Sequence, residues 1–362
     1  MLEMDRTFHP RKTSMTTDKK CLGCGILLQT TEITKVGYIN ILENDYCKRC
    51  FRIRHYGDYA SFKQEGVSSL KVLKTIGELP GTILLVLDVT DLESGLFKGI
   101  RRHLPDREFI LAVTKRDLLP STVSESKILS QLARKLKEES IQSTGAVLLG
   151  NHSKDNIESL RTLLRKLPKS QNIITTGYAN VGKSTLLNAL LDEPSKLTIS
   201  PYPHTTLDIQ AFTWEGHTLY DTPGIRLEAS LLDFVPHEQI PEIVMNQRLK
   251  PITYQLSGDQ CFILPYIGSL SVFPQGEATI TLYFSQNLKI HRTKVAHRDD
   301  YLEKHQPFSK AADMKRLVLV KTEDKMDVVF KQIGWVCITG AVEKIEVLSP
   351  LKDQVVLRKA MI

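Results

Sequence analysis

Short hydrophobic runs alternate with amphipathic stretches between about residue 65 and residue 220. The runs have the length of buried strands and span residues 82–87, 109–113, 146–149, 172–176 and 217–220. Between them, helical patterns span residues 124–139, 155–166 and 183–191. Because strands that alternate with helices are typical of parallel sheets, this part of the chain is predicted to be an α/β domain with a mostly parallel sheet.

The pattern changes after Asp233. Prolines then interrupt the chain repeatedly, and residues 278–284 and 315–320 have the composition of antiparallel strands. We therefore expect an α/β domain at residues 65–232 and a separate strand-rich α+β domain at residues 233–362.

The composition is that of a globular protein: 41% of the 362 residues are hydrophobic and 25% are charged. This excludes a mainly disordered chain. No apolar run approaches the roughly 18 residues needed to cross a bilayer, and residues 1–18 are polar, as in a mobile tail. We expect a monomeric cytoplasmic protein without a membrane partner. Residues 1–64 hold eleven Lys and Arg against seven Asp and Glu, and this basic excess is weak evidence for an anionic partner.

A phosphate-binding loop is predicted at Gly177–Ser184, whose sequence GYANVGKS matches GxxxxGK[ST] between a strand and a helix. Its backbone N–H groups and the helix N-terminus would bind phosphates. Lys183 would bridge the β- and γ-phosphates, and the Ser184 hydroxyl would bind Mg²⁺.

Two downstream segments resemble the switches of translation-factor-type GTPases. Asp221-Thr-Pro-Gly224 is similar to switch II, in which the aspartate holds Mg²⁺ through water and the glycine N–H senses a γ-phosphate. Pro203-His-Thr-Thr206 is similar to switch I. The resemblance makes Thr206 the Mg²⁺ ligand, with Thr205 as the alternative.

The base-reading loop lies upstream of the phosphate loop. Thr114-Lys-Arg-Asp117 follows a predicted strand, as an NKxD loop does, and the Asp117 carboxylate can accept hydrogen bonds from guanine N1 and N2. Adenine lacks both donors, so the loop favours GTP over ATP. A fifth GTPase element near Gly150 is degenerate. The residues expected to bind GTP are Thr114, Lys115, Asp117, Gly177, Asn180, Val181, Gly182, Lys183, Ser184, Thr185, Asp221 and Gly224.

This motif order is a circular permutation of the usual GTPase order, which compact domains tolerate because their ends often lie close together. Switch II then leads directly into residues 233–362, and we expect the nucleotide state to be relayed there. Together with two CxxC pairs at the N-terminus, the order resembles that of the YqeH family of circularly permuted GTPases. The resemblance implies a GTPase that acts in assembly of the small ribosomal subunit.

The residue after Gly224 is Ile225, which cannot orient a water as the glutamine of Ras-like enzymes does. In similar loops with the pattern GxxNxGKS, the asparagine helps to bind K⁺, and Asn180 occupies that position. The alternative role of Asn180 is a turn hydrogen bond. The expected catalytic group is Asn180, Lys183, Thr206, Asp221 and Gly224, with Mg²⁺ held by Ser184, Thr206 and Asp221.

A zinc-binding domain is predicted at residues 19–64. Cys21, Cys24, Cys47 and Cys50 form two CxxC pairs, a spacing typical of a tetrahedral Zn²⁺ site. Cations surround the second pair, and the candidates for RNA contact are Lys48, Arg49, Arg52 and Arg54. Their alternative role is a solvated surface.

Three functions fit these motifs. The first is a zinc-containing GTPase switch that binds the small ribosomal subunit or its rRNA. The second is a non-catalytic RNA-binding adaptor that senses GTP and GDP, in which Ile225 marks lost hydrolysis. The third is a P-loop ATPase or kinase, against which Asp117 argues.

Overall fold

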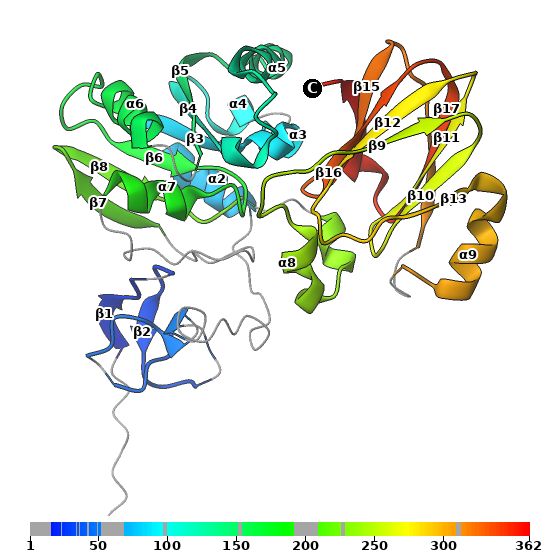
Figure 1. Ribbon diagram of the computed structural model, residues 1–362. Helices are drawn as coiled ribbons and strands as arrows, with labels where there is room; N and C mark the ends of the chain where they lie inside the picture. The colour runs from blue at the N-terminus through cyan, green and yellow to red at the C-terminus, as the bar shows by residue number, and fades with distance from the viewer. Residues whose placement is uncertain are drawn as a thin grey trace, which may run out of the picture.

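The fold is described from a computed structural model, shown in Figure 1. The structure describes residues 16–22, 24–33, 35, 37–41, 43–48, 50–51, 69–96, 100–150, 154–191, 209–225, 229–308 and 313–362. Residues 1–15 of the tail expected at residues 1–18 lie outside these ranges. Residues 16–18 instead belong to strand β1 (Thr16–Lys20), which pairs with β2 (Leu27–Gln29). In the described part of the chain, no helix is both long enough and apolar enough to cross a membrane.

The α/β domain is built on a six-stranded sheet with strand order β5-β4-β3-β6-β8-β7. Every neighbouring pair is parallel except β7 with β8. The strands are β3 (Thr82–Asp88), β4 (Phe109–Thr114), β5 (Ser143–Leu148), β6 (Ile173–Thr176), β7 (Gln210–Trp214) and β8 (His217–Asp221). The helices are α2 (Ser69–Glu78), α3 (Leu92–Gly95), α4 (Ile100–His103), α5 (Glu125–Glu138), α6 (Lys154–Leu164) and α7 (Lys183–Leu190). The predicted fold class is confirmed.

Burial explains the middle of the sheet. All seven residues of β3 are buried, and all six of β4, because helices cover both faces of a parallel sheet. On the α5 side of the domain, the Ser124 side chain caps the helix by accepting from the Lys127 N–H.

The sheet order shows the permutation in space. Strand β6, which precedes the phosphate loop, is followed along the chain by β7 and β8 on one side of the sheet. The strands β3, β4 and β5 come earlier in the chain but lie on its other side (Figure 1). The carboxyl ends of the parallel strands β3, β4, β6 and β8 therefore meet at one edge, where parallel sheets bind ligands.

Two strands of this sheet differ from the sequence prediction, and the helices α2, α3 and α4 were not predicted. Strand β5 begins at Ser143 rather than at residue 146, because the polar residues 143–145 still pair with β4 at the edge of the sheet. The antiparallel edge strand β7 was not predicted, since only its two end residues, Gln210 and Trp214, are buried and it lacks a hydrophobic run.

The strand-rich part contains two five-stranded antiparallel sheets, with orders β13-β10-β11-β17-β14 and β18-β15-β16-β12-β9. A shared hydrophobic core lies between them. The strands are β9 (Ile252–Leu256), β10 (Gln260–Leu264), β11 (Gly268–Pro274), β12 (Ala278–Tyr283), β13 (His291–Lys294), β14 (Lys315–Leu319), β15 (Lys325–Phe330), β16 (Gly334–Thr339), β17 (Val342–Ser349) and β18 (Val355–Lys359). The helices are α8 (Ile240–Ile243) and α9 (Arg298–His305).

The α/β core continues into the strand-rich part. Tyr283 and Trp335, stacked with ring centroids 4.8 Å apart, belong to the same buried cluster as the central strands of the α/β sheet. Met245 and Leu249, which follow α8, belong to it as well. The domain boundary expected at residue 232 remains a prediction. Side chains from both sides of this boundary are buried in the same hydrophobic core.

A buried ion network also crosses this contact. The Arg358 guanidinium lies 3.3 Å from Asp327 Oδ2 and 3.6 Å from Glu93 Oε1, and Lys135 Nζ lies 2.6 Å from Glu93 Oε2. Burial raises the pKa of Asp327, and the Arg358 charge opposes that shift. Arg358 therefore stabilises an otherwise unfavourable buried carboxylate.

We predict that Arg358→Leu lowers the free energy of unfolding by about 3 kcal/mol, because it leaves Asp327 buried without its cation. Since an unpaired Asp327 can be protonated at low pH, the loss should be larger at pH 8 than at pH 5. Urea unfolding at both pH values tests this. The control is Lys359→Leu, which removes an exposed pair with Glu323 and should cost less than about 1 kcal/mol. Equal losses of unfolding free energy in the two variants would contradict the role assigned to Arg358.

Candidate functional site

The phosphate loop connects the central strand β6 to α7. Gly177 and Gly182 have φ values of 153° and 93°, and Asn180 has a φ of 65°. A Cβ atom at Gly177 would lie 2.3 Å from the Val86 carbonyl oxygen, so the close approach of the loop to β3 requires glycine. Ser184 and Thr185 lie in the first turn of α7 and are half-buried.

Lys183 is buried at the start of α7. Its Nζ donates to the Gly177 carbonyl at 3.0 Å and to the Tyr178 carbonyl at 2.8 Å. Burial lowers the pKa of Lys183 to about 8, and the charge of Asp221 opposes the shift. An anion that replaced the two carbonyls would favour the charged amine strongly, as a nucleotide phosphate does.

The Asp221–Gly224 segment lies directly against the phosphate loop. Asp221 is fully buried at the end of β8, next to β6. The Ile225 N–H donates to the Gly177 carbonyl at 3.1 Å, and the Ala179 N–H donates to the Ile225 carbonyl at 3.1 Å. A Cβ atom at Gly224 would lie 2.9 Å from the Ala179 Cα, so glycine permits this contact. The structure thus brings Asp221 and Gly224 to the phosphate loop, as the motif predicts.

The base-reading loop also reaches the phosphate loop. The Thr114 hydroxyl lies 3.0 Å from the Leu87 carbonyl and 2.5 Å from the Val181 carbonyl. A threonine at the usual asparagine position therefore still connects the two loops. Lys115 has a φ of 61°, and its Nζ lies 2.5 Å from Asp88 Oδ2.

Gly150 contacts the base-reading aspartate. A Cβ atom at Gly150 would lie 3.2 Å from Asp117 Oδ1, and the Leu149 carbonyl accepts from the Arg116 N–H at 2.9 Å. The degenerate fifth element is therefore placed beside Asp117 as backbone. The sequence analysis names Gly150 without a role and does not predict Asp88 as a site residue, because its only signal is its position at the end of a buried strand.

Some predicted site residues cannot be placed. Thr205 and Thr206 lie outside the described residues, so the Mg²⁺ set has only Ser184 and Asp221 in place. Lys48 is exposed, with its Nζ 6.0 Å from the centre of the Tyr38 ring. The other predicted RNA-contact residues, Arg49, Arg52 and Arg54, also lie outside the described residues.

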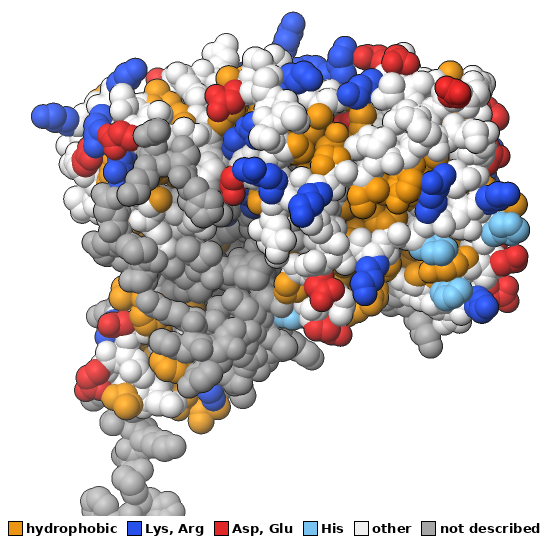
Figure 2. Space-filling model, viewed as in Figure 1, with side chains coloured by type: hydrophobic (Ala, Val, Ile, Leu, Met, Phe, Trp, Pro, Cys, Tyr) orange, Lys and Arg blue, Asp and Glu red, His pale blue; other side chains and the backbone are white. Residues whose placement is uncertain are grey.

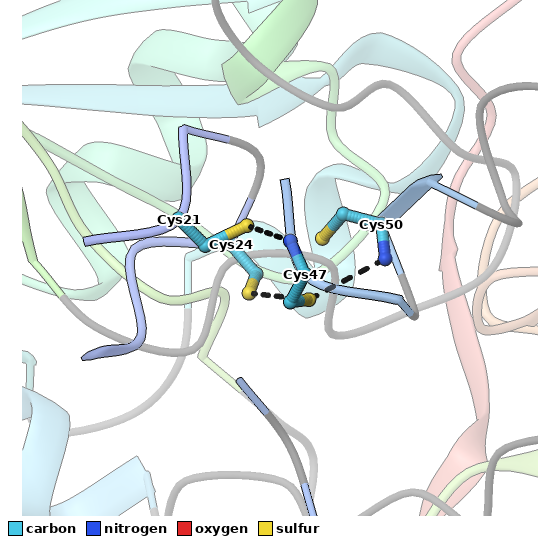
Figure 3. A group of neighbouring side chains, drawn as sticks. All are labelled: Cys21, Cys24, Cys47 and Cys50. Atoms are coloured by element: carbon cyan, nitrogen blue, oxygen red, sulfur yellow. Dashed lines mark hydrogen bonds between the residues drawn. The ribbon is translucent and has the colours of Figure 1, made fainter. Parts of the chain in front are cut away.

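The four paired cysteines form one buried cluster (Figure 3). Their sulfur atoms all lie within 4.8 Å of one another, and Cys24 Sγ lies 3.8 Å from Cys47 Sγ. Zn–S bonds of about 2.3 Å in a tetrahedron place sulfur atoms about 3.8 Å apart, so the cluster fits Zn²⁺. The Cys47 N–H lies 3.2 Å from Cys21 Sγ, and the Cys50 N–H lies 3.5 Å from Cys47 Sγ; both are backbone donors that would stabilise thiolates.

Comparison with known families finds two matching segments. A model described as "50S ribosome-binding GTPase" matches residues 172–256, and one described as "YqeH-like, C-terminal" matches residues 277–361. The YqeH protein of Bacillus subtilis (strain 168) is 28% identical over 94% of this chain and 99% of its own length. The chain is similar to YqeH over nearly its full length and contains a GTPase domain. The GTPase match begins just before β6 because the permuted half of the domain, with the base-reading loop, lies upstream.

More distant similarities cover less of each protein. The chain is 26% identical to NO-associated protein 1, chloroplastic/mitochondrial, of Arabidopsis thaliana, over 74% of this chain and 53% of that protein. Among solved structures, YjeQ from Thermotoga maritima matches with 24% identity and a TM-score of 0.29, over 42% of this chain and 51% of that one.

We predict that GTP binding takes up a proton above pH 8. Below pH 8 the Lys183 amine of the free protein is already protonated. Above pH 8 this amine loses its proton, and binding of the nucleotide phosphates favours its return. The dissociation constant should thus be nearly flat from pH 7 to pH 8 and rise by up to tenfold over the next unit. Calorimetry at pH 8.5 in two buffers of different ionisation enthalpy measures the uptake.

Lys183→Arg is the matched control for this uptake. It keeps a charge throughout this pH range and should bind GTP without proton uptake. The same uptake in both proteins would show that Lys183 is not its source.

Proposed function

We propose that this YqeH-like GTPase is a GTP-dependent switch in assembly of the small ribosomal subunit. The observation that carries the nucleotide part is the meeting of the base-reading and phosphate loops, in which the Thr114 hydroxyl bonds to Val181 and Asp117 packs against Gly150. A carboxylate at that position recognises the N1–H and 2-amino group of guanine. Preferential binding of ATP in competition with GTP would exclude this function.

Hydrolysis would depend on charge rather than on a water-orienting side chain. Ile225 is buried, and its aliphatic side chain has no donor or acceptor with which to activate water. The remaining charges would be Lys183 and an Mg²⁺ that Ser184, Asp221 and Thr206 would hold, which would neutralise charge on the phosphates. Turnover should therefore be slow until another cation or the ribosomal particle completes the site. If no partner restores turnover, Ile225 favours the alternative of a non-catalytic GTP- and GDP-sensing adaptor.

Two surfaces support contact with ribosomal RNA. The zinc-binding region exposes Lys48 and Phe51 beside the second cysteine pair. On the strand-rich part, His291, Tyr301 and His305 form a continuous stack with ring centroids 3.9 and 4.1 Å apart. Figure 2 shows Lys, Arg and His side chains on this part of the surface next to hydrophobic ones. Cations bind phosphates and exposed rings stack on unpaired bases.

We predict that the protein co-sediments with small ribosomal subunits when a non-hydrolysable GTP analogue is bound and dissociates when GDP is bound. The analogue and GDP are compared on separated small and large subunits, because the matching GTPase model is described by binding to the 50S particle. Preferential binding to large subunits would identify the large subunit, rather than the small one, as the partner. Absence of binding to either subunit would remove the ribosomal role.

The position of Asn180 predicts a cation effect. Its backbone has a φ of 65° at the tip of the phosphate loop, where a K⁺ would lie near the β- and γ-phosphate oxygens. We expect GTP turnover to be at least tenfold faster in KCl than in NaCl at equal ionic strength, and Asn180→Ala to abolish the difference. Equal turnover in both salts would contradict the K⁺ site.

A further inference from the structure

The base-reading loop continues into a short 3₁₀ turn, Arg116–Leu118, which carries Asp117. The hydrogen bonds inside this turn use the Lys115 and Arg116 carbonyls as acceptors. The next two carbonyls, those of Asp117 and Leu118, lie at the end of the turn. Because the last carbonyls of a short helix have no partner within it, they must be bound by groups from elsewhere in the protein.

Both carbonyls are bound by residues from a distant part of the chain. Arg248 Nε donates to the Asp117 carbonyl at 3.3 Å, across 131 positions of sequence. The neighbouring Leu249 N–H donates to the Leu118 carbonyl at 2.8 Å, and both leucines are buried in the same core. The end of the turn that carries the guanine-reading carboxylate is therefore held by residues outside every recognised GTPase motif.

The segment that carries Arg248 is attached in turn to the strand-rich part, through two consecutive side chains that follow β12. The Ser285 hydroxyl donates to the Glu242 carbonyl at 2.5 Å. Gln286 Nε2 donates to the Arg248 carbonyl at 2.9 Å. Between these two points, Met245 is buried in the α/β core. The backbone of Arg248 is thus fixed both to the strand-rich part and to the α/β domain.

The α/β domain supports the base-reading turn at its start. The Thr114 hydroxyl donates to the Leu87 carbonyl, and the Arg116 N–H donates to the Leu149 carbonyl. A short turn that is held at its start can still tilt about that point. Its orientation is fixed when its far end is also bound, which is the position of the contacts from Arg248 and Leu249.

Guanine recognition is sensitive to this orientation because it uses two hydrogen bonds to one carboxylate. Asp117 can accept from guanine N1–H and from the 2-amino group, and hydrogen bonds weaken steeply when they are misaligned. Hypoxanthine has the N1–H and lacks the 2-amino group. The difference in affinity between guanine and hypoxanthine nucleotides therefore measures the second bond, whereas a change in phosphate binding affects both nucleotides equally.

We propose that Arg248 is a positioning residue for guanine recognition, which fixes the end of the turn that carries Asp117. The strictness of base selection is thereby set by a residue that the strand-rich part holds in place. The inference rests on the proposed guanine-nucleotide switch and deepens it, because it names a determinant of the selectivity of that site.

Arg248→Met tests the proposal, because methionine retains a long unbranched side chain and has no donor. Dissociation constants for GDP and for inosine diphosphate (IDP), whose base is hypoxanthine, are measured on the full chain. Loss of one hydrogen bond that aligns the turn predicts that the ratio of the IDP constant to the GDP constant falls by about threefold to tenfold. Since Arg248 is exposed, the variant should keep nearly the thermal stability of the wild-type protein.

Two further variants separate the hydrogen bond from the positive charge. Arg248→Gln places its amide nitrogen at the same distance along the side chain as the arginine Nε, so it can donate to the Asp117 carbonyl without a charge. It should retain most of the wild-type ratio. Lys250→Met removes a neighbouring exposed cation and should leave the ratio unchanged.

The outcomes distinguish this inference from the proposed function. A wild-type protein that binds GDP, combined with an unchanged ratio in Arg248→Met, would overturn the inference and leave the guanine-nucleotide switch in place. An equal fall of the ratio in Arg248→Met and Lys250→Met would also overturn it, because charge alone would then explain the effect. Failure of the wild-type protein to bind either GTP or GDP would overturn the proposed function and the inference together.

Discussion

The parallel pairing of β3 with β6 is the interaction on which the rest of the nucleotide site depends. It aligns residues 82–85 with residues 173–176 and joins two halves of the GTPase sheet that occur in reversed order along the chain. Because β4 pairs with the other side of β3, the base-reading loop comes within hydrogen-bond distance of the phosphate loop. Loss of this pairing would separate guanine recognition from phosphate binding, although each motif would remain intact in sequence.

The same pairing explains which parts of the fold could be predicted. The buried strands β3 and β4 have continuous apolar runs, and the phosphate loop and the cysteine pairs have spacings that few other structures require. Strand β5 begins with polar residues, and in the edge strand β7 buried and exposed positions alternate only weakly. The first and last residues of these strands are therefore set by pairing with neighbouring strands rather than by their own composition. For these strands, hydrogen bonding to a neighbour outweighs local hydrophobicity.

The contacts missing from the sequence prediction are of a different kind. Gly150 matters because it has no side chain next to Asp117. No local sequence pattern distinguishes such a glycine from a glycine in an ordinary turn. The hydrogen bond between Gln332 and Asp91 joins the turn between β15 and β16 to the segment after β3, at a separation of 241 positions. Glutamine in a tight turn carries no periodicity or motif, so only the packing of the two parts reveals its partner.

The permutation also changes the course of the chain beyond switch II. From Ser230 the chain enters the strand-rich part, yet it first returns to the base-reading loop, where the Leu249 N–H donates to the Leu118 carbonyl at 2.8 Å. Arg248 Nε lies 3.3 Å from the Asp117 carbonyl, and Leu249 is buried in the α/β core. Residues 230–249 thus connect the exit of switch II to the guanine-reading loop. One core and one buried ion network then fix the strand-rich part to the α/β domain.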